Sequence, residues 1–106
     1  MPVIEDNDIR IEVNEEGFMA RPEEWSNVAA SVLAKAEEGI EDLTGEHWAV
    51  IEFIRNHYRD KGTAPMVRKM CQATGFPLKR IYELFPSGPA KGACKIAGLP
   101  KPDGCV

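Results

Sequence analysis

Apolar residues recur along the chain at two different periods. Near the N-terminus Ile9, Ile11 and Val13 alternate with charged residues, which is the period-two pattern of a half-buried strand. Residues 14–17 predict a turn, and residues 18–21 predict the returning strand of a β-hairpin. A lone hairpin is marginally stable in water, so we expect this one to pack on a larger body.

From Pro22 onward the apolar residues follow the period of an α-helix. Helices are predicted to start near Pro22, Thr44, Pro65 and Pro77 and to stop at Gly39, Gly62, Gly75 and Pro86, with a last short helix over 89–97. Their predicted buried faces are Trp25, Val28, Ala29, Val32, Leu33 and Ala36; Trp48, Ile51, Ile54 and Tyr58; Met66, Val67, Met70 and Cys71; Leu78, Ile81, Tyr82 and Phe85; and Ala90, Ala93, Cys94 and Ala97.

The pattern predicts a mainly α fold, a small helical bundle with an N-terminal β-hairpin. A chain of 106 residues forms one domain. We divide it into the hairpin over 1–21, a helical body over 22–97 and a C-terminal arm over 98–106. Pro100 and Pro102 exclude a helix in this arm, and Gly98 and Gly104 loosen its backbone, so we expect it to be mobile.

Charge is divided unevenly between the two halves of the chain. Residues 1–54 carry three basic and fourteen acidic side chains, a net charge of −11, whereas residues 55–106 carry ten basic and three acidic ones, a net charge of +7. The basic half is suited to docking on an acidic partner, an anionic substrate or nucleic acid. No signal peptide or membrane-spanning run is visible, so we expect a cytoplasmic protein, where structural disulfides are rare.

The three cysteines differ in their surroundings. Cys71 lies on an apolar helix face and is expected to be core filler. Cys94 has Lys91 and Lys95 beside it, and cations of this kind stabilise a reactive thiolate, although a packed structural thiol is the alternative. Cys105 is an exposed thiol on the predicted arm. A short arm would give the two C-terminal thiols an effective concentration of about a millimolar, which predicts a redox or sulfur-carrying pair.

Other chemistry is less well supported by the sequence. Residues 64–85 have the outline of a helix-turn-helix, with Arg68, Lys69, Lys79 and Arg80 exposed, so a DNA-binding regulator stays open as an alternative. The two histidines, His47 and His57, stand apart from the cysteines and are expected to be surface or packing residues. No metal or cofactor is therefore predicted.

Three stretches of the sequence resemble one known family. Residues 63–68 (TAPMVR), 82–89 (YELFPSGP) and 91–106 (KGACKIAGLPKPDGCV) look like the DsrC/TusE family, once called the gamma subunit of dissimilatory sulfite reductase. The resemblance covers the whole chain and is most specific from Thr63 onward. The tRNA-thiolation branch typically retains only the penultimate cysteine, so the presence of Cys94 favours the DsrC branch.

The resemblance implies a protein co-substrate of dissimilatory sulfite reductase and not a stand-alone enzyme. The penultimate cysteine, here Cys105, would accept a sulfur intermediate in the reductase, and Cys94 would close on it to form a trisulfide. Lys91, Lys95, Lys101 and Arg80 are the expected substrate- or partner-binding residues. A membrane-bound thiol/disulfide redox complex and sulfurtransferases are the further implied partners. Either direction of sulfur flow fits the sequence, and a single-cysteine persulfide relay in tRNA thiolation is the alternative.

Overall fold

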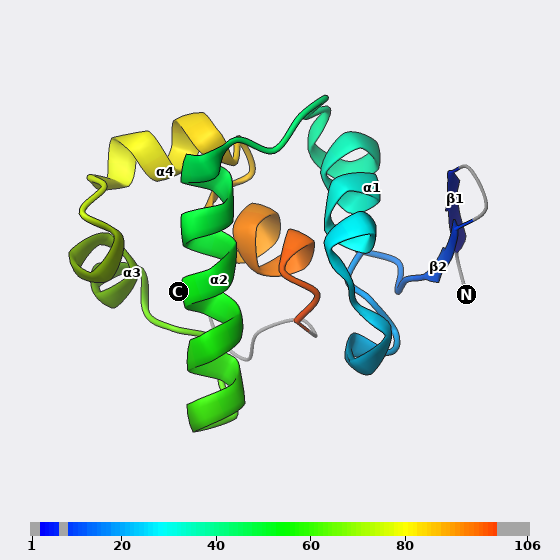
Figure 1. Cartoon of the computed structure of the whole chain (residues 1–106), viewed down its shortest axis with the longest axis horizontal. Coiled ribbons are helices and arrows are strands. Elements are labelled where there is room, and N and C mark those ends of the chain that lie inside the picture. The colour runs from blue at the N-terminus through cyan, green and yellow to red at the C-terminus, as the bar shows by residue number, and fades with distance from the viewer. Residues whose placement is uncertain (1–2, 7–8, 100–106) are drawn as a thin grey trace.

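Figure 1 shows the computed structural model of the chain, which describes residues 3–6 and 9–99. The fold is mainly helical, with a two-stranded antiparallel sheet at its N-terminal end, as predicted. The elements in chain order are β1 (Val3–Asp6), β2 (Ile9–Glu12), the 3-10 turn η1 (Pro22–Glu24), α1 (Asn27–Glu38), α2 (Gly45–Lys61), α3 (Val67–Thr74), α4 (Leu78–Leu84) and the π-helical segment η2 (Pro89–Cys94).

The hairpin forms with a different partner strand from the one predicted. β2 pairs with β1, which places Ile4 opposite Ile11, and both pack on the core next to α1. The expected return strand over 18–21 contributes a single bridge between Val13 and Met19. The prediction was wrong because β1 offers an apolar residue directly across from Ile11, and such cross-strand pairs stabilise a sheet.

The first helix begins later than predicted. Pro22 starts only the short turn η1, and Trp25 therefore lies outside any α-helix. The hydroxyl of Ser26 accepts a hydrogen bond from the amide of Ala29 at 3.2 Å and caps α1. The predicted stops at positions 39, 62 and 75 are confirmed, since each glycine there takes the left-handed conformation that ends its helix.

Some of the predicted buried side chains are on the surface. Val28, Met66, Leu78 and Tyr82 are each at least 45% exposed, and Ala36 is exposed as well. On α1 the buried residues are Ala29, Ala30, Val32, Leu33 and Ala34, so three of the predicted positions are confirmed. Val28 and Ala36, which are exposed, lie in the first and last turns of this helix. The prediction extended the buried face to both ends of α1, although helical periodicity alone does not show where along its length a helix is covered.

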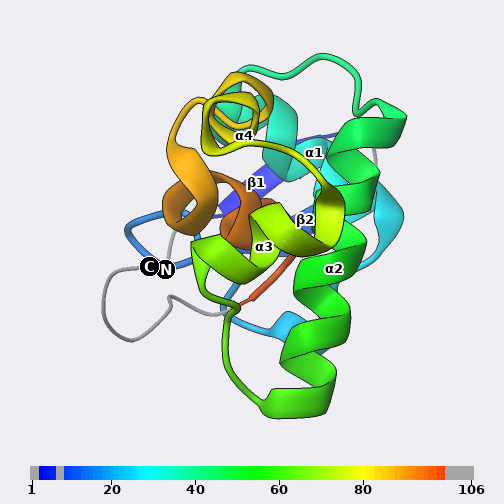
Figure 2. The ribbon, with the colours of Figure 1, turned by 90° about the vertical axis from the view of Figure 1, so that its left-hand side faces the viewer.

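The segment from Pro89 to Leu99 forms the centre of the molecule. Ala93, Cys94, Ile96, Ala97 and Leu99 are all at most 1% exposed. Figures 1 and 2 both show this segment in the middle of the fold, with α1 on one side and α2 and α3 on the other. The predicted buried face is confirmed at Ala93, Cys94 and Ala97, and burial extends beyond it to Ile96 and Leu99, while Lys91 is exposed.

Candidate functional site

Cys94 lies in the core, with none of its surface exposed. Burial raises the pKa of its thiol from the ordinary value of 9.0 to about 12. In this conformation Cys94 is a packed thiol, which is the alternative that the sequence left open beside a lysine-stabilised thiolate. The Lys95 ammonium lies 3.5 Å from a carboxylate oxygen of Glu37 and 5.3 Å from the ring centre of Phe18, while Lys91 is exposed. Cys94 in this state is a protected thiol.

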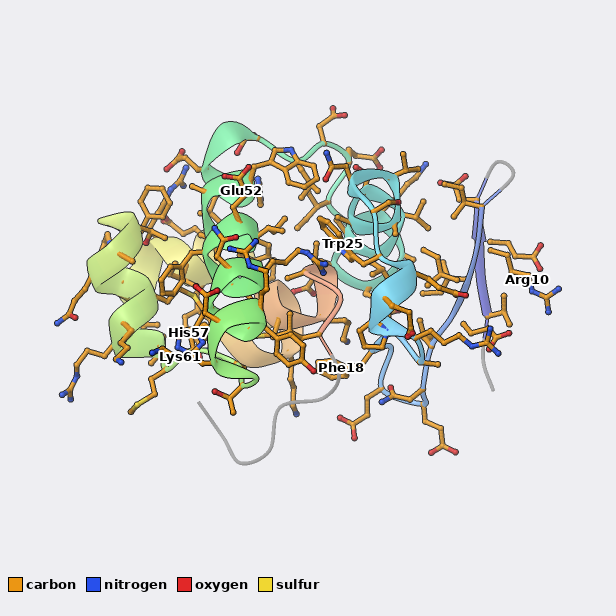
Figure 3. All side chains as sticks on the ribbon, turned by 60° about the horizontal axis from the view of Figure 1, so that its bottom comes forward. Arg10, Phe18, Trp25, Glu52, His57 and Lys61 are labelled. Carbon is orange, nitrogen blue, oxygen red and sulfur yellow. The ribbon has the colours of Figure 1, made fainter. Side chains whose placement is uncertain are left out.

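Two side chains hold the turn that follows Cys94. The indole nitrogen of Trp25 donates a hydrogen bond to the carbonyl oxygen of Ile96 at 2.9 Å. The guanidinium of Arg55, from α2, donates one to the carbonyl oxygen of Ala97 at 2.7 Å. The guanidinium also lies over the indole ring of Trp25, 3.8 Å from its centre. We call Trp25 and Arg55 the clamp; Figure 3 shows Trp25 between α1 and α2.

Neither clamp residue was predicted to be part of the site. Trp25 was assigned to a helix stripe, and Arg55 was not singled out. Their hydrogen-bond partners lie 71 and 42 residues away in the chain. No local pattern indicates contacts of that range, because a residue's chain neighbours carry no information about them. Burial lowers the pKa of the Arg55 guanidinium, in keeping with its place at the edge of the core.

The start of the predicted arm is part of the folded body. Gly98 and Leu99 were assigned to the arm, yet both are buried. The amide of Leu99 donates a hydrogen bond to the carbonyl oxygen of Cys94 at 3.2 Å. The folded body therefore includes Leu99, which lies next to the backbone of Cys94. Cys105 and Lys101 lie outside the described residues.

Arg80, predicted to bind a partner, is engaged within the chain. Its guanidinium binds both carboxylate oxygens of Glu46, at 3.1 and 2.6 Å, and lies 3.4 Å from Glu83. The hydrogen bonds from Arg80 hold the pKa of Glu46 below its usual range. Arg68, Lys69 and Lys79 are exposed on the same pair of helices, as expected. The pairing of Arg80 removes one of the two base-reading side chains on which the DNA-binding alternative depended.

The remaining predicted residues have structural roles. Cys71 on α3 is partly buried against the core, so it is less enclosed than expected. The ring of His47 accepts a hydrogen bond from the Thr44 amide and completes the cap of α2. Its other nitrogen lies 2.9 Å from the carbonyl oxygen of Leu84. His47 is thus a packing residue, one of the two roles anticipated for it.

Within 3–6 and 9–99 the structure holds no group of three histidine, cysteine, aspartate or glutamate side chains placed to bind a metal ion. None of the helices in this described part has the length and apolar character needed to cross a bilayer.

A family model and individual relatives of known name both match this chain, and they point to the same family. The family model described as "DsrC like protein" matches residues 5–106. The gamma subunit of dissimilatory-type sulfite reductase from Nitratidesulfovibrio vulgaris is 52% identical, over 90% of each chain. The sulfurtransferase TusE of Escherichia coli is 41% identical, over 91% of this chain and 93% of TusE.

The structural comparison agrees with the sequence relatives. The crystal structure of the oxidised gamma subunit, DsrC, of dissimilatory sulfite reductase from Archaeoglobus fulgidus superimposes with a TM-score of 0.86 at 41% identity, covering 99% of this chain and 100% of that one. This likeness extends over the helices, the N-terminal sheet and the central segment that carries Cys94. The chain therefore belongs to the DsrC-like family.

Proposed function

We propose that this protein is a sulfur carrier for dissimilatory sulfite reductase, acting through Cys105 and Cys94. Membership of the DsrC-like family supports a sulfur-carrying role, since the named relatives are a sulfite reductase subunit and a sulfurtransferase. The observation that carries the proposal is the place of Cys94, buried beside the residue from which the arm leaves the body. Cys94 is thus anchored in the body, and in this proposal Cys105 is the thiol carried by the C-terminal arm, which we call the tether.

The length of the tether fits a shuttle between two sites. Cys105 is the sixth residue after Leu99, and an extended chain of six residues reaches about 20 Å. Because Leu99 is hydrogen-bonded to Cys94, this reach covers Cys94 when the tether folds back. The same reach, directed outward, would carry Cys105 into the active site of a docked reductase. The exposed cations Arg68, Lys69 and Lys79 are the proposed docking residues for an acidic partner surface.

The proposed chemistry uses each thiol once. The Cys105 thiolate attacks the sulfur of sulfite that the reductase has reduced by two electrons, an S–O bond breaks and hydroxide leaves, and an S–S–OH group remains on Cys105. Cys94 attacks the outer sulfur, a trisulfide joins the two cysteines, and the hydroxyl leaves as water with the thiol proton. A reducing partner, which the family resemblance suggests is a membrane complex, then supplies four electrons and four protons. The products are two thiols and hydrogen sulfide.

Intact mass spectrometry after exposure to the reductase, sulfite and an electron donor tests this proposal. The parent protein should gain about 32 Da, the mass of one sulfur, less two hydrogens. Cys105→Ala should gain nothing, whereas Cys94→Ala should accumulate an open adduct on Cys105. Cys71→Ala is the matched control and should behave like the parent.

The same experiment separates the alternative, a single-cysteine persulfide relay of the kind named for TusE. In that case Cys94→Ala would load and release sulfur as the parent does, and no bridged form would be seen in either protein. Absence of sulfur on Cys105 in the parent, with both the reductase and a persulfide donor, would contradict a carrier role altogether.

A further inference from the structure

We propose that Arg55 and Trp25 are positioning residues for the resolving thiol: together they hold the turn after Cys94 closed, and Cys94 reacts only when their hold is released. The inference rests on the proposed role of Cys94 as the second thiol of the pair. It deepens that role by naming the side chains that control when the thiol becomes available.

The clamp residues donate hydrogen bonds to two successive backbone carbonyl groups, those of Ile96 and Ala97. The hydrogen bond from Arg55 is short and its donor is charged, and bonds of this kind are about twice as strong as neutral ones. It is also partly buried, so water competes poorly for the same carbonyl. These bonds hold the backbone two and three residues beyond Cys94, so their loss would free the turn that directly follows the thiol.

The two clamp residues act as one unit. The Arg55 guanidinium rests on the face of the Trp25 indole, so each side chain fixes the orientation of the other. Loss of either should therefore loosen both hydrogen bonds. A surface cavity of about 400 Å³ adjoins the clamp and is lined by Arg55, Trp25, Trp48 and Glu52, among others. This space allows the ring and the guanidinium to move apart without displacing the core.

Exposure alone would change the reactivity of Cys94. The Cys94 side chain is fully buried, and burial is the cause of the raised pKa of its thiol. The turn that the clamp holds also includes Leu99, whose amide donates a hydrogen bond to the carbonyl oxygen of Cys94. Release of the clamp would therefore loosen the backbone on the C-terminal side of Cys94 and give access to its thiol.

The test measures alkylation of Cys94 in the fully reduced, full-length protein. Iodoacetamide reacts with a thiolate and releases iodide, and peptide mapping gives a separate rate for each cysteine. We expect Arg55→Ala to raise the Cys94 rate about tenfold, which corresponds to about 1.4 kcal/mol. Trp25→Phe keeps an aromatic face but removes the N–H donor, and should raise the rate about fivefold. Arg55→Lys, which keeps a charged donor without the flat guanidinium, should fall between parent and alanine variant.

Cys71 and Arg59 supply the controls. Cys71 sits on α3, away from the clamp, and its rate should stay within about twofold of the parent. Arg59 lies one turn beyond Arg55 on α2 but is exposed and pairs only with Asp60 among the described residues; Arg59→Ala should leave Cys94 unchanged. Hydrogen exchange gives a second measure: the Leu99 amide should lose protection in the clamp variants, while the Gly75 amide, bonded to Cys71, should not.

The labelling rates of Cys94 and Cys71, taken together, decide for or against the clamp. Faster labelling of Cys94 with unchanged Cys71 supports the clamp. An unchanged Cys94 rate in folded variants overturns it, as does a proportional rise at Cys71, which would mean general loosening. Because the assay needs neither Cys105 nor the reductase, it can succeed even if sulfur transfer through the two thiols fails, and the two proposals are judged separately.

Discussion

Gly98 packs directly against the indole ring of Trp25. A Cβ atom added at Gly98 would collide with Cδ1 and Cγ of that ring, and the backbone φ angle of +81° is one that other residues rarely adopt. We therefore expect Gly98→Ala to lower the free energy of unfolding by about 2–4 kcal/mol, from backbone strain and overpacking together. Urea unfolding followed by circular dichroism measures this loss.

Gly62→Ala is the matched control for this substitution. Gly62 has a similar φ angle of +74°, but nothing lies within 4 Å of the added Cβ. Its cost should be limited to backbone strain, about 1 kcal/mol. Equal losses in the two variants would show that Trp25 does not press on Gly98 in solution.

The three cysteines should react with a thiol reagent in a definite order. Cys94 is fully buried with a pKa of about 12, so it should be the slowest. Cys71 is partly buried and should react at an intermediate rate. Cys105, on the proposed arm, should react first. Brief alkylation at pH 8 followed by peptide mapping gives the order, and labelling of Cys94 before Cys71 would contradict the structure.

Stability should fall in alkaline solution because of Cys94. The folded protein raises the pKa of this thiol from 9.0 to about 12, so between these values the unfolded chain loses a proton that the folded chain keeps. Folding then binds a proton, and the free energy of unfolding falls as the pH rises, by at most about 1.4 kcal/mol per pH unit. The free energy of unfolding, measured from pH 8 to 10.5, should fall more steeply in the parent than in Cys94→Ala. The difference between the two slopes is the contribution of this thiol. Cys71→Ala should show the same pH dependence as the parent. If the slope disappeared in Cys71→Ala, the pH dependence would come from Cys71 and the prediction for Cys94 would be wrong.

His47 joins the start of α2 to the end of α4. Its ring accepts a hydrogen bond from the amide of Thr44, the residue that caps α2. The other ring nitrogen lies 2.9 Å from the carbonyl oxygen of Leu84, and the ring meets that of Phe85 edge-on, with 5.2 Å between the ring centres. His47→Leu should cost about 2–4 kcal/mol, because it removes a cap and leaves a buried carbonyl without its donor. Thr44→Ala removes only the cap and should cost about 1 kcal/mol. Thermal unfolding of both variants compares them, and a smaller loss for His47→Leu than for Thr44→Ala would mean that the Leu84 contact contributes nothing.

The sequence by itself determined the helical class, the helix stops at three glycines, the start of α2 at Thr44 and the family. Helix ends are local: a glycine after a helix or a threonine before one acts on backbone groups within a few residues, as at Gly39 and Thr44. The C-terminal motif around Cys94 and Cys105 identified the family for a similar reason, because a long string of residues is recognisable without knowledge of its contacts.

Only the tertiary structure decided which strand pairs with β2, how wide each buried face is and where the body ends. Leu99 was assigned to the arm from its glycine and proline neighbours, but packing at the centre of the fold buries it. The lysines beside Cys94 in sequence suggested a thiolate, whereas burial in the core raises the pKa of its thiol. The clamp of Trp25 and Arg55 unites residues from distant parts of the chain. Such contacts arise from the way the elements pack, and no short stretch of sequence encodes them.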